Sequence, residues 1–131
     1  MEYLEDIVKM AKAAMECGTV REALNSGAKI KKEVFVSRIS EESGKWFEGF
    51  VDLLIEYQDF VEIVDYKSAA VLPEGSGKNF PRYSYQLALY AWSLGNTFDK
   101  KIRGKIIYLA PEGAKEVVVD IEGVLAQLNW S

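Results

Sequence analysis

Hydrophobic and polar positions alternate along this chain with two different periods. Residues 2–17 place apolar side chains three and four positions apart, which predicts an amphipathic helix that ends before Gly18. The apolar positions of this predicted helix include Ile7, Val8, Ala11, Ala14 and Met15. A second short helical segment is expected within 19–28. Three runs rich in β-branched and aromatic residues then predict strands at 30–38, 46–56 and 60–67.

A polar segment separates these strands from the second half of the chain. Residues 68–82 contain Pro, Gly, Ser and Asn with little periodicity and predict a long loop. A helix, two strands and a short last helix follow, at 83–94, 103–110, 115–120 and from the cap residue Asp120 to Leu128. This order predicts a three-stranded meander and a crossover helix, and therefore a mixed sheet with helices on its faces. We expect one domain over 1–131.

The composition narrows the chemistry that is available. The chain has no histidine and one cysteine, Cys17, which excludes Ser-His-Asp catalysis, a zinc finger and an iron–sulfur cluster. Any metal must therefore be held by oxygen ligands, which favours magnesium or manganese over zinc. A net charge of −4 counts against a dedicated DNA-binding protein but not against a nuclease site, which is itself acidic. No membrane span or signal peptide is visible, and a cytoplasmic location is expected.

Two of the predicted strands carry an aspartate where burial is expected, at Asp52 and Asp65. Strand alternation places Asp65 and Lys67 on one face, and a hairpin around 57–59 would bring Asp52 beside Asp65. Two neighbouring carboxylates repel each other unless a divalent cation lies between them. Lys67 beside such a cation could orient an attacking water or stabilise charge on a phosphate. This arrangement suits hydrolysis of a phosphodiester.

Simpler explanations exist for each of these residues. An acidic-x-Lys tripeptide is expected about once by chance in a chain of this length, and Asp99–Lys101 is a second example that needs no site. A surface ion pair would explain Asp65 and Lys67 alone. Gln86 and Tyr90 share a helical face, which a core stripe with Gln86 at its edge would also explain. A glycosidase with paired carboxylates would leave Lys67 without a role.

Four short motifs occur in a specific order. They are "KKEVFV" at 31–36, "GFVD" at 49–52, "DYKSA" at 65–69 and "YSYQLALYAW" at 83–92. Together they resemble the nuclease domain of the RecB and AddA helicase–nucleases, in the PD-(D/E)xK superfamily, over roughly residues 20–120. The resemblance implies an α/β (α+β) fold with a restriction-endonuclease-like core, that is, a central mixed sheet of about five strands flanked by helices.

The resemblance also assigns roles. It implies that Asp52, Asp65 and the Tyr66 backbone carbonyl bind magnesium or manganese, and that Lys67 is the catalytic lysine. Gln86 and Tyr90 would orient site groups or contact the DNA backbone. Glu33 is either an outer-shell metal residue or an edge-strand charge. Lys78 and Arg82 lie in the predicted long loop next to the proposed site, where we expect them to contact phosphates. The implied activity is exonuclease cleavage of DNA, beside a helicase or other subunits of a helicase–nuclease complex.

One feature departs from the family pattern. RecB-like nucleases complete the metal site with a histidine on an upstream helix, and this chain has none. Three explanations are open: the helix precedes residue 1 in a longer parent whose C-terminal part this chain is, Glu5 or Glu16 substitutes, or the site is incomplete. The alternative function is therefore a catalytically silent module that binds DNA or scaffolds a helicase–nuclease complex. The absence of a cysteine cluster separates the chain from the iron–sulfur branch of the family.

Overall fold

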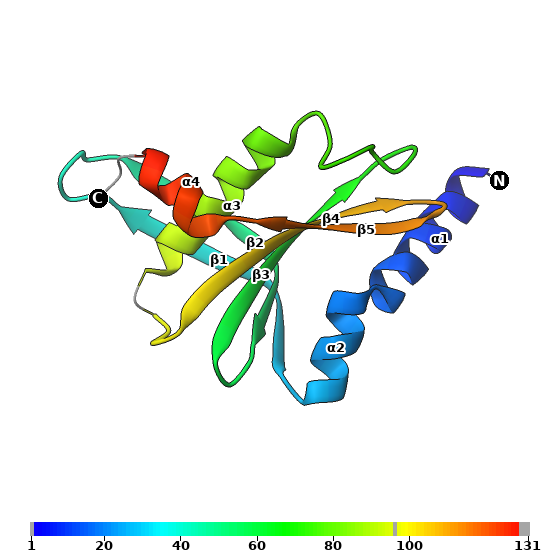
Figure 1. The fold of residues 1–131 in the computed structure, drawn as a ribbon, viewed down its shortest axis with the longest axis horizontal. Helices are drawn as coiled ribbons and strands as arrows, with labels where there is room; N and C mark the ends of the chain where they lie inside the picture. The colour runs from blue at the N-terminus through cyan, green and yellow to red at the C-terminus, as the bar shows by residue number, and fades with distance from the viewer. Residues whose placement is uncertain (1, 96, 129–131) are drawn as a thin grey trace.

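The elements of the fold follow the predicted order (Figure 1). The structure is a computed structural model that describes residues 2–95 and 97–128. Its helices and strands are α1 (Glu2–Glu16), α2 (Gly18–Ser26), β1 (Lys29–Ile39), β2 (Trp46–Glu56), β3 (Phe60–Ser68), α3 (Phe80–Leu94), β4 (Lys101–Ala110), β5 (Gly113–Val119) and α4 (Ile121–Leu128). The amide of Gly123 donates to Asp120 Oδ1 at 3.1 Å, so Asp120 caps α4 as predicted.

The start of α3 differs from the prediction. The helix begins at Phe80 rather than at residue 83, and Pro81 lies in its first turn. Proline is favoured there because its fixed φ suits a helix and its missing N–H has no intrahelical acceptor. Arg82 therefore lies on the helix and not in the preceding loop.

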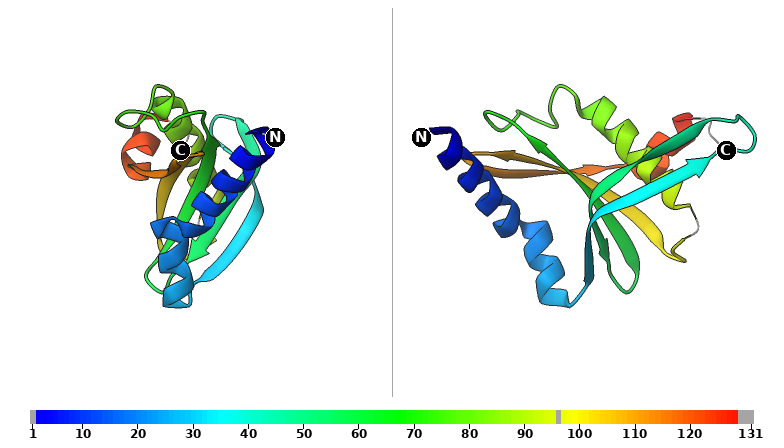
Figure 2. Two further views of the ribbon diagram at one scale, coloured as in Figure 1. Left: turned by 90° about the vertical axis from the view of Figure 1, so that its right-hand side faces the viewer. Right: turned by 180° about the vertical axis from the view of Figure 1, so that it is seen from behind.

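Over the described residues the strands form one five-stranded sheet in the order β1-β2-β3-β4-β5, and β3 is its central strand. Neighbouring strands are antiparallel except β3 and β4, which are parallel because α3 crosses between them. Helices α3 and α4 cover one face, and α1 and α2 cover the other (Figure 2). This is the predicted mixed sheet with helices on both faces. None of the helices in this part of the chain is long and apolar enough to cross a membrane.

The inward face of α1 was predicted only in part: Ala14 packs inward, but three larger predicted positions do not. Ile7, Val8 and Met15 are exposed, Met15 by 70%. The helix instead packs through Met10, Ala13 and Ala14 against a cluster that contains Ile107 and Leu109 of β4. Alanines permit a close approach to the sheet, so the tertiary contact selects a different face from the one that periodicity favours.

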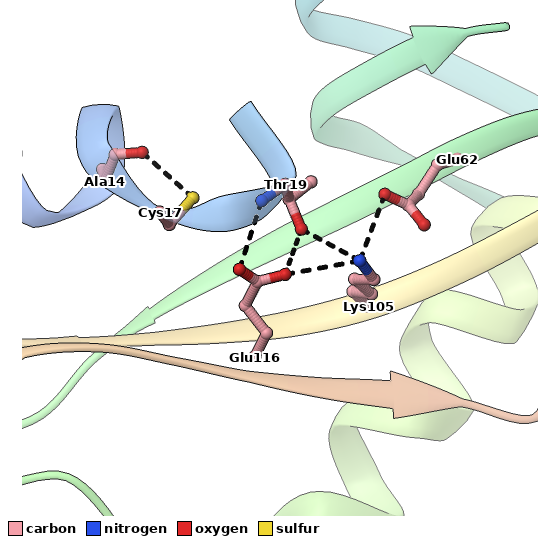
Figure 3. A network of polar contacts seen from close by, with 6 residues as sticks. All are labelled: Ala14, Cys17, Thr19, Glu62, Lys105 and Glu116. Atoms are coloured by element: carbon pink, nitrogen blue, oxygen red, sulfur yellow. Dashed lines mark hydrogen bonds and ion pairs between the residues drawn. The ribbon is translucent and has the colours of Figure 1, made fainter. Parts of the chain in front are cut away.

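A polar network attaches the first turn of α2 to the sheet (Figure 3). Thr19 donates its amide to Glu116 Oε2 at 3.2 Å and its hydroxyl to Glu116 Oε1. Lys105 Nζ donates to the Thr19 hydroxyl at 3.0 Å and lies 3.7 Å from Glu62 Oε1. Burial raises the pKa of Glu62, and Lys105 opposes that rise. Despite burial, the hydrogen bonds from Thr19 and the charge of Lys105 lower the pKa of Glu116.

The hairpin of β1 and β2 changes its inward side at one cross-strand position. Strict alternation would place six apolar residues of the hairpin on one face. Instead, three of them, Ile30, Leu53 and Ile55, pack against the α1–α2 side, and the other three, Val34, Val36 and Val51, pack against α3. Glu33 and Asp52 lie between the paired positions Lys32–Leu53 and Val34–Val51 but do not pair. Glu33 has φ +51°, a left-handed conformation that is unfavourable for a glutamate. The strands therefore turn over at Glu33 and Asp52.

Candidate active site

The candidate site lies where β2 and β3 separate. Their ladder runs from Glu56–Val61 to Leu53–Val64 and stops, so the next opposed residues are Asp52 and Asp65. Asp52 Oδ2 accepts a hydrogen bond from the Tyr66 amide at 2.8 Å. A side-chain carboxylate thus satisfies a backbone donor at the point where the ladder ends. The hairpin brings Asp52 close to Asp65, as the strand pattern predicted.

Asp65 is a buried carboxyl group with an unusual environment. The residue is 5% exposed, and its Oδ2 lies 2.8 Å from Lys67 Nζ as an ion pair. The two groups are not aligned as a hydrogen bond, so this oxygen has no hydrogen-bond partner among the described residues. Burial raises the pKa of Asp65 to about 6; Lys67 opposes the rise and the Asp52 carboxylate adds to it. A buried carboxylate oxygen that accepts no hydrogen bond is suited to receive a cation.

Lys67 is held by groups from two elements. Besides Asp65 on its own strand, Nζ donates to Gln86 Oε1 of α3 at 3.3 Å. The same nitrogen lies 4.5 Å from the centre of the Tyr83 ring, one helical turn before Gln86. Sequence reasoning placed Lys67 and Gln86 in one site, and the fold brings them into contact.

Tyr90 lies deeper than the other candidates. It is buried, and its ring packs against Gly49 of β2 and lies 5.5 Å from the Phe47 ring, measured between centroids. Burial raises the pKa of Tyr90, and the carboxylates of Asp65 and Asp52 add to this rise. Tyr90 is therefore a core residue that also lies within electrostatic reach of both aspartates.

The remaining candidates surround this centre at different distances. Glu33 and the Tyr66 side chain line a hollow of about 510 Å³ together with Asp52, on the side of α1 and α2. Lys78 lines a second hollow, of about 220 Å³, together with Lys67. Arg82 is exposed on α3 with its guanidinium 5.5 Å from the Tyr83 ring centre, and it lines neither hollow.

The site offers two carboxylates to a divalent cation. Within residues 2–95 and 97–128, no three His, Cys, Asp or Glu side chains come together as a metal-binding group. Glu5 and Glu16 are exposed on α1 and do not line the hollow at Asp52. Magnesium binds with one or two carboxylates and completes its shell with water and phosphate oxygens. The pair Asp52 and Asp65, in which the buried Asp65 Oδ2 accepts no hydrogen bond from the described residues, fits that requirement.

Sequence reasoning missed the aromatic support of Lys67. Tyr83 was given no role at the site, although its position three residues before Gln86 places both on one face of the helix. Tyr108 was not considered, yet it pairs with Lys67 in the parallel register of β3 and β4. The rings of Tyr83 and Tyr108 lie 6.3 Å apart. The chain order gave no signal for Tyr108, because its pairing depends on the crossover through α3.

Known sequences are similar to this chain both as a family and as individual proteins. A family model described as the PD-(D/E)XK nuclease superfamily matches residues 3–127. Proteins named as ATP-dependent helicase/nuclease subunits are similar over part of the chain: 36% identity over 61 residues in Lachnoclostridium phytofermentans, and 36% over 69 residues in Pediococcus pentosaceus. These matches cover 47% and 50% of this chain but only 4% and 6% of the relatives. The chain therefore corresponds to a small part of those proteins.

A solved structure supports the fold independently. The crystal structure of SSO0001 aligns with 92% of this chain and 62% of its own, at a TM-score of 0.51 and 16% identity. At this identity the likeness concerns the fold alone.

Proposed function

The chain belongs to the PD-(D/E)XK nuclease superfamily, and on that premise we propose that it is a metal-dependent DNA nuclease that hydrolyses phosphodiester bonds. The observation that carries the proposal is the meeting of Asp52, Asp65 and Lys67 at the end of the β2–β3 ladder, with Lys67 Nζ 2.8 Å from Asp65 Oδ2. Two carboxylates and one lysine at a strand end supply the groups that this hydrolysis needs.

We assign the following roles to the residues. Asp52, Asp65 and the Tyr66 carbonyl would hold magnesium or manganese, which when bound activates water and neutralises phosphate charge. Lys67 donates a hydrogen bond to a phosphate oxygen or to the attacking water. Gln86 directs the lysine through its 3.3 Å contact. Tyr90 positions β2 through Gly49.

The relatives indicate a setting for this activity. Because their names describe subunits of ATP-dependent helicase/nucleases, we infer that this chain is a nuclease-like part of a longer helicase–nuclease. We also propose, from the resemblance in the sequence, that residues 1–131 are one domain at the C-terminal end of that protein and that it acts in the cytoplasm. Cleavage would then be exonucleolytic, on DNA that the helicase delivers. Glu33 would act from the outer shell of the metal, and Lys78 would contact the DNA backbone beside Lys67.

A second candidate function rests on one observation. The described residues supply no third acidic side chain to the Asp52–Asp65 pair. A catalytically silent module that binds DNA or scaffolds a helicase–nuclease complex would be compatible with that arrangement. Metal-dependent cleavage distinguishes the two candidates directly.

The test is cleavage of end-labelled linear DNA, single- and double-stranded, with magnesium or manganese. Lys67→Ala should lower the rate about a hundredfold or more, because it removes a group that stabilises the transition state. The matched control is Lys101→Ala at the other Asp-x-Lys tripeptide, which lies 3.8 Å from Glu122 on the surface and should leave the rate unchanged. Equal rates in wild type and Lys67→Ala would refute the mechanism. Absence of cleavage in the wild type would favour the silent module.

A further inference from the structure

The proposed catalytic lysine has a positioning requirement that Asp65 cannot meet alone. A lysine side chain has a flexible four-carbon stem, and its ammonium must be fixed in place for efficient catalysis. In the structure its closest partner is Asp65 Oδ2, at 2.8 Å. Asp65 is also a proposed metal ligand, so its negative charge is shared once a cation is bound. The Lys67 ammonium therefore needs a second partner whose interaction is not weakened by metal binding.

We propose that Tyr83 is a positioning residue that holds the Lys67 ammonium through the face of its ring. This inference rests on the proposed nuclease function and extends it. The ammonium lies 4.5 Å from the Tyr83 ring centre, within the range of a cation–π interaction. Gln86 fixes a second direction through its 3.3 Å hydrogen bond. Together the two α3 residues define where Nζ lies independently of the carboxylate.

The Tyr83 ring is itself held in place. Tyr108 lies beside it with 6.3 Å between ring centroids, and the Tyr108 hydroxyl donates to the Ser76 carbonyl at 2.7 Å. That contact closes the loop between β3 and α3 over the rings. Gly77 makes it possible, because a Cβ at this position would lie 2.6 Å from the Tyr108 hydroxyl oxygen. The lysine, the two rings and the loop thus lie together around the smaller hollow.

The chain provides a matched control for this role. Tyr85 lies two residues further along α3 and is 45% exposed. It has the same ring chemistry but lines neither hollow at the site. A substitution at Tyr85 therefore reports the general effect of removing a tyrosine from α3.

The first experiment measures cleavage of end-labelled DNA by the Tyr83 variants in magnesium. Tyr83→Phe keeps the ring face and should retain kcat, whereas Tyr83→Leu should lower kcat about tenfold with KM for DNA unchanged. Tyr85→Leu should match the wild type. A series of increasingly fluorinated phenylalanines in place of Tyr83 should lower kcat stepwise. Fluorine weakens the cation–π interaction at the ring face with little change in the size of the side chain. Full activity in Tyr83→Leu or in the fluorinated series would overturn the proposal.

The second experiment does not depend on activity. Ring currents should shift the Lys67 ε-methylene protons upfield in lysine-labelled protein, with and without magnesium. The shift should persist in Tyr83→Phe and disappear in Tyr83→Leu, and its absence from the wild type would overturn the proposal. If the shift is present but the wild type cuts no DNA, the nuclease function fails while the Tyr83–Lys67 contact stands.

Discussion

The ring of Tyr90 occupies the space that a side chain on Gly49 would need. A Cβ built on Gly49 would lie 2.7 Å from Tyr90 Cε1, which is closer than real side-chain contacts allow. The contact joins α3 to β2 three residues before Asp52. It gives a physical reason for the glycine of the "GFVD" motif and links it to the tyrosine of the helix motif.

Gly49→Ala should therefore destabilise the protein and impair the site. The added methyl must displace the buried Tyr90 ring, at a cost of about 1–3 kcal/mol in the free energy of unfolding. Urea denaturation measures this cost, and Glu48→Ala on the exposed neighbour serves as control. In a Tyr90→Leu background the same Gly49→Ala change should cost clearly less. An unchanged cost there would show that the ring is not the obstacle.

The stability of the metal-free protein should fall as the pH rises through the titration of Asp65. The folded state holds this proton more tightly than the unfolded state, with a pKa of about 6 against an ordinary value of 3.8. Well below pH 3.8 the Asp65 carboxyl group is protonated in both states, and above pH 6 the folded state carries it as a buried charge. The difference corresponds to a loss of about 3 kcal/mol over the whole titration, of which about 2 kcal/mol falls between pH 4 and pH 7 because the unfolded state is already largely ionised at pH 4.

Asp65→Asn isolates this effect from other titrating groups such as Glu62, whose pKa is also raised by burial. Urea denaturation across pH 4–7 should show a shallower loss of stability in the variant than in the wild type. Magnesium should stabilise the wild type above pH 6 and have little effect on the variant. Identical pH profiles for the two proteins would contradict the prediction.

Glu33→Gly should stabilise the fold. Glu33 has φ +51°, and a residue with a Cβ pays about 1 kcal/mol in this region, which glycine does not. Glu33→Ala keeps the Cβ and should bring no such gain. Thermal unfolding compares the two variants, and equal stabilities would show that the positive φ carries no cost. Magnesium affinity should fall in both, if Glu33 acts on the metal from the outer shell as proposed.

Thr19→Val should loosen α2 without changing catalysis. The substitution keeps the shape of the side chain but removes the hydroxyl between Glu116 and Lys105, which should cost about 1–2 kcal/mol. Ser26→Ala, at the other end of α2, is the control. Urea denaturation should show a lower stability, whereas the cleavage rate should stay unchanged. A parallel loss of rate would mean that α2 supports the site.

The strand pattern was sufficient to predict most of the fold. Alternation on β3 correctly placed Asp65 and Lys67 on one face, and the hairpin brought Asp52 to them. The inward face of α1 was predictable only in part, because small alanines and not the larger Ile7 or Val8 meet the sheet. Local pattern identifies an amphipathic helix, but the surface it meets decides which side is buried.

The candidate site was predictable in its strand residues, in Gln86 and in Lys78, but two of its features were not. The turnover of the hairpin at Glu33 and Asp52 requires a positive φ at a glutamate, which sequence preference argues against. The contact of Tyr83 with Lys67 depends on the direction of a helical side chain relative to a strand end. Both features arise from tertiary packing, so the local periodicity of the sequence does not reveal them.

Because the β2–β3 ladder is short, ligand binding at the two aspartates and the pairing of β2 with β3 are thermodynamically coupled. Opening its few pairs would part Asp52 from Asp65 and leave the β1–β2 hairpin and the β3–β4–β5 half each intact. Any ligand held by both aspartates therefore also fastens the two halves of the sheet. Amide hydrogen exchange across residues 53–56 and 61–64 should slow in proportion to the ligand's affinity. The exchange rates of these backbone amides therefore measure the occupancy of the site.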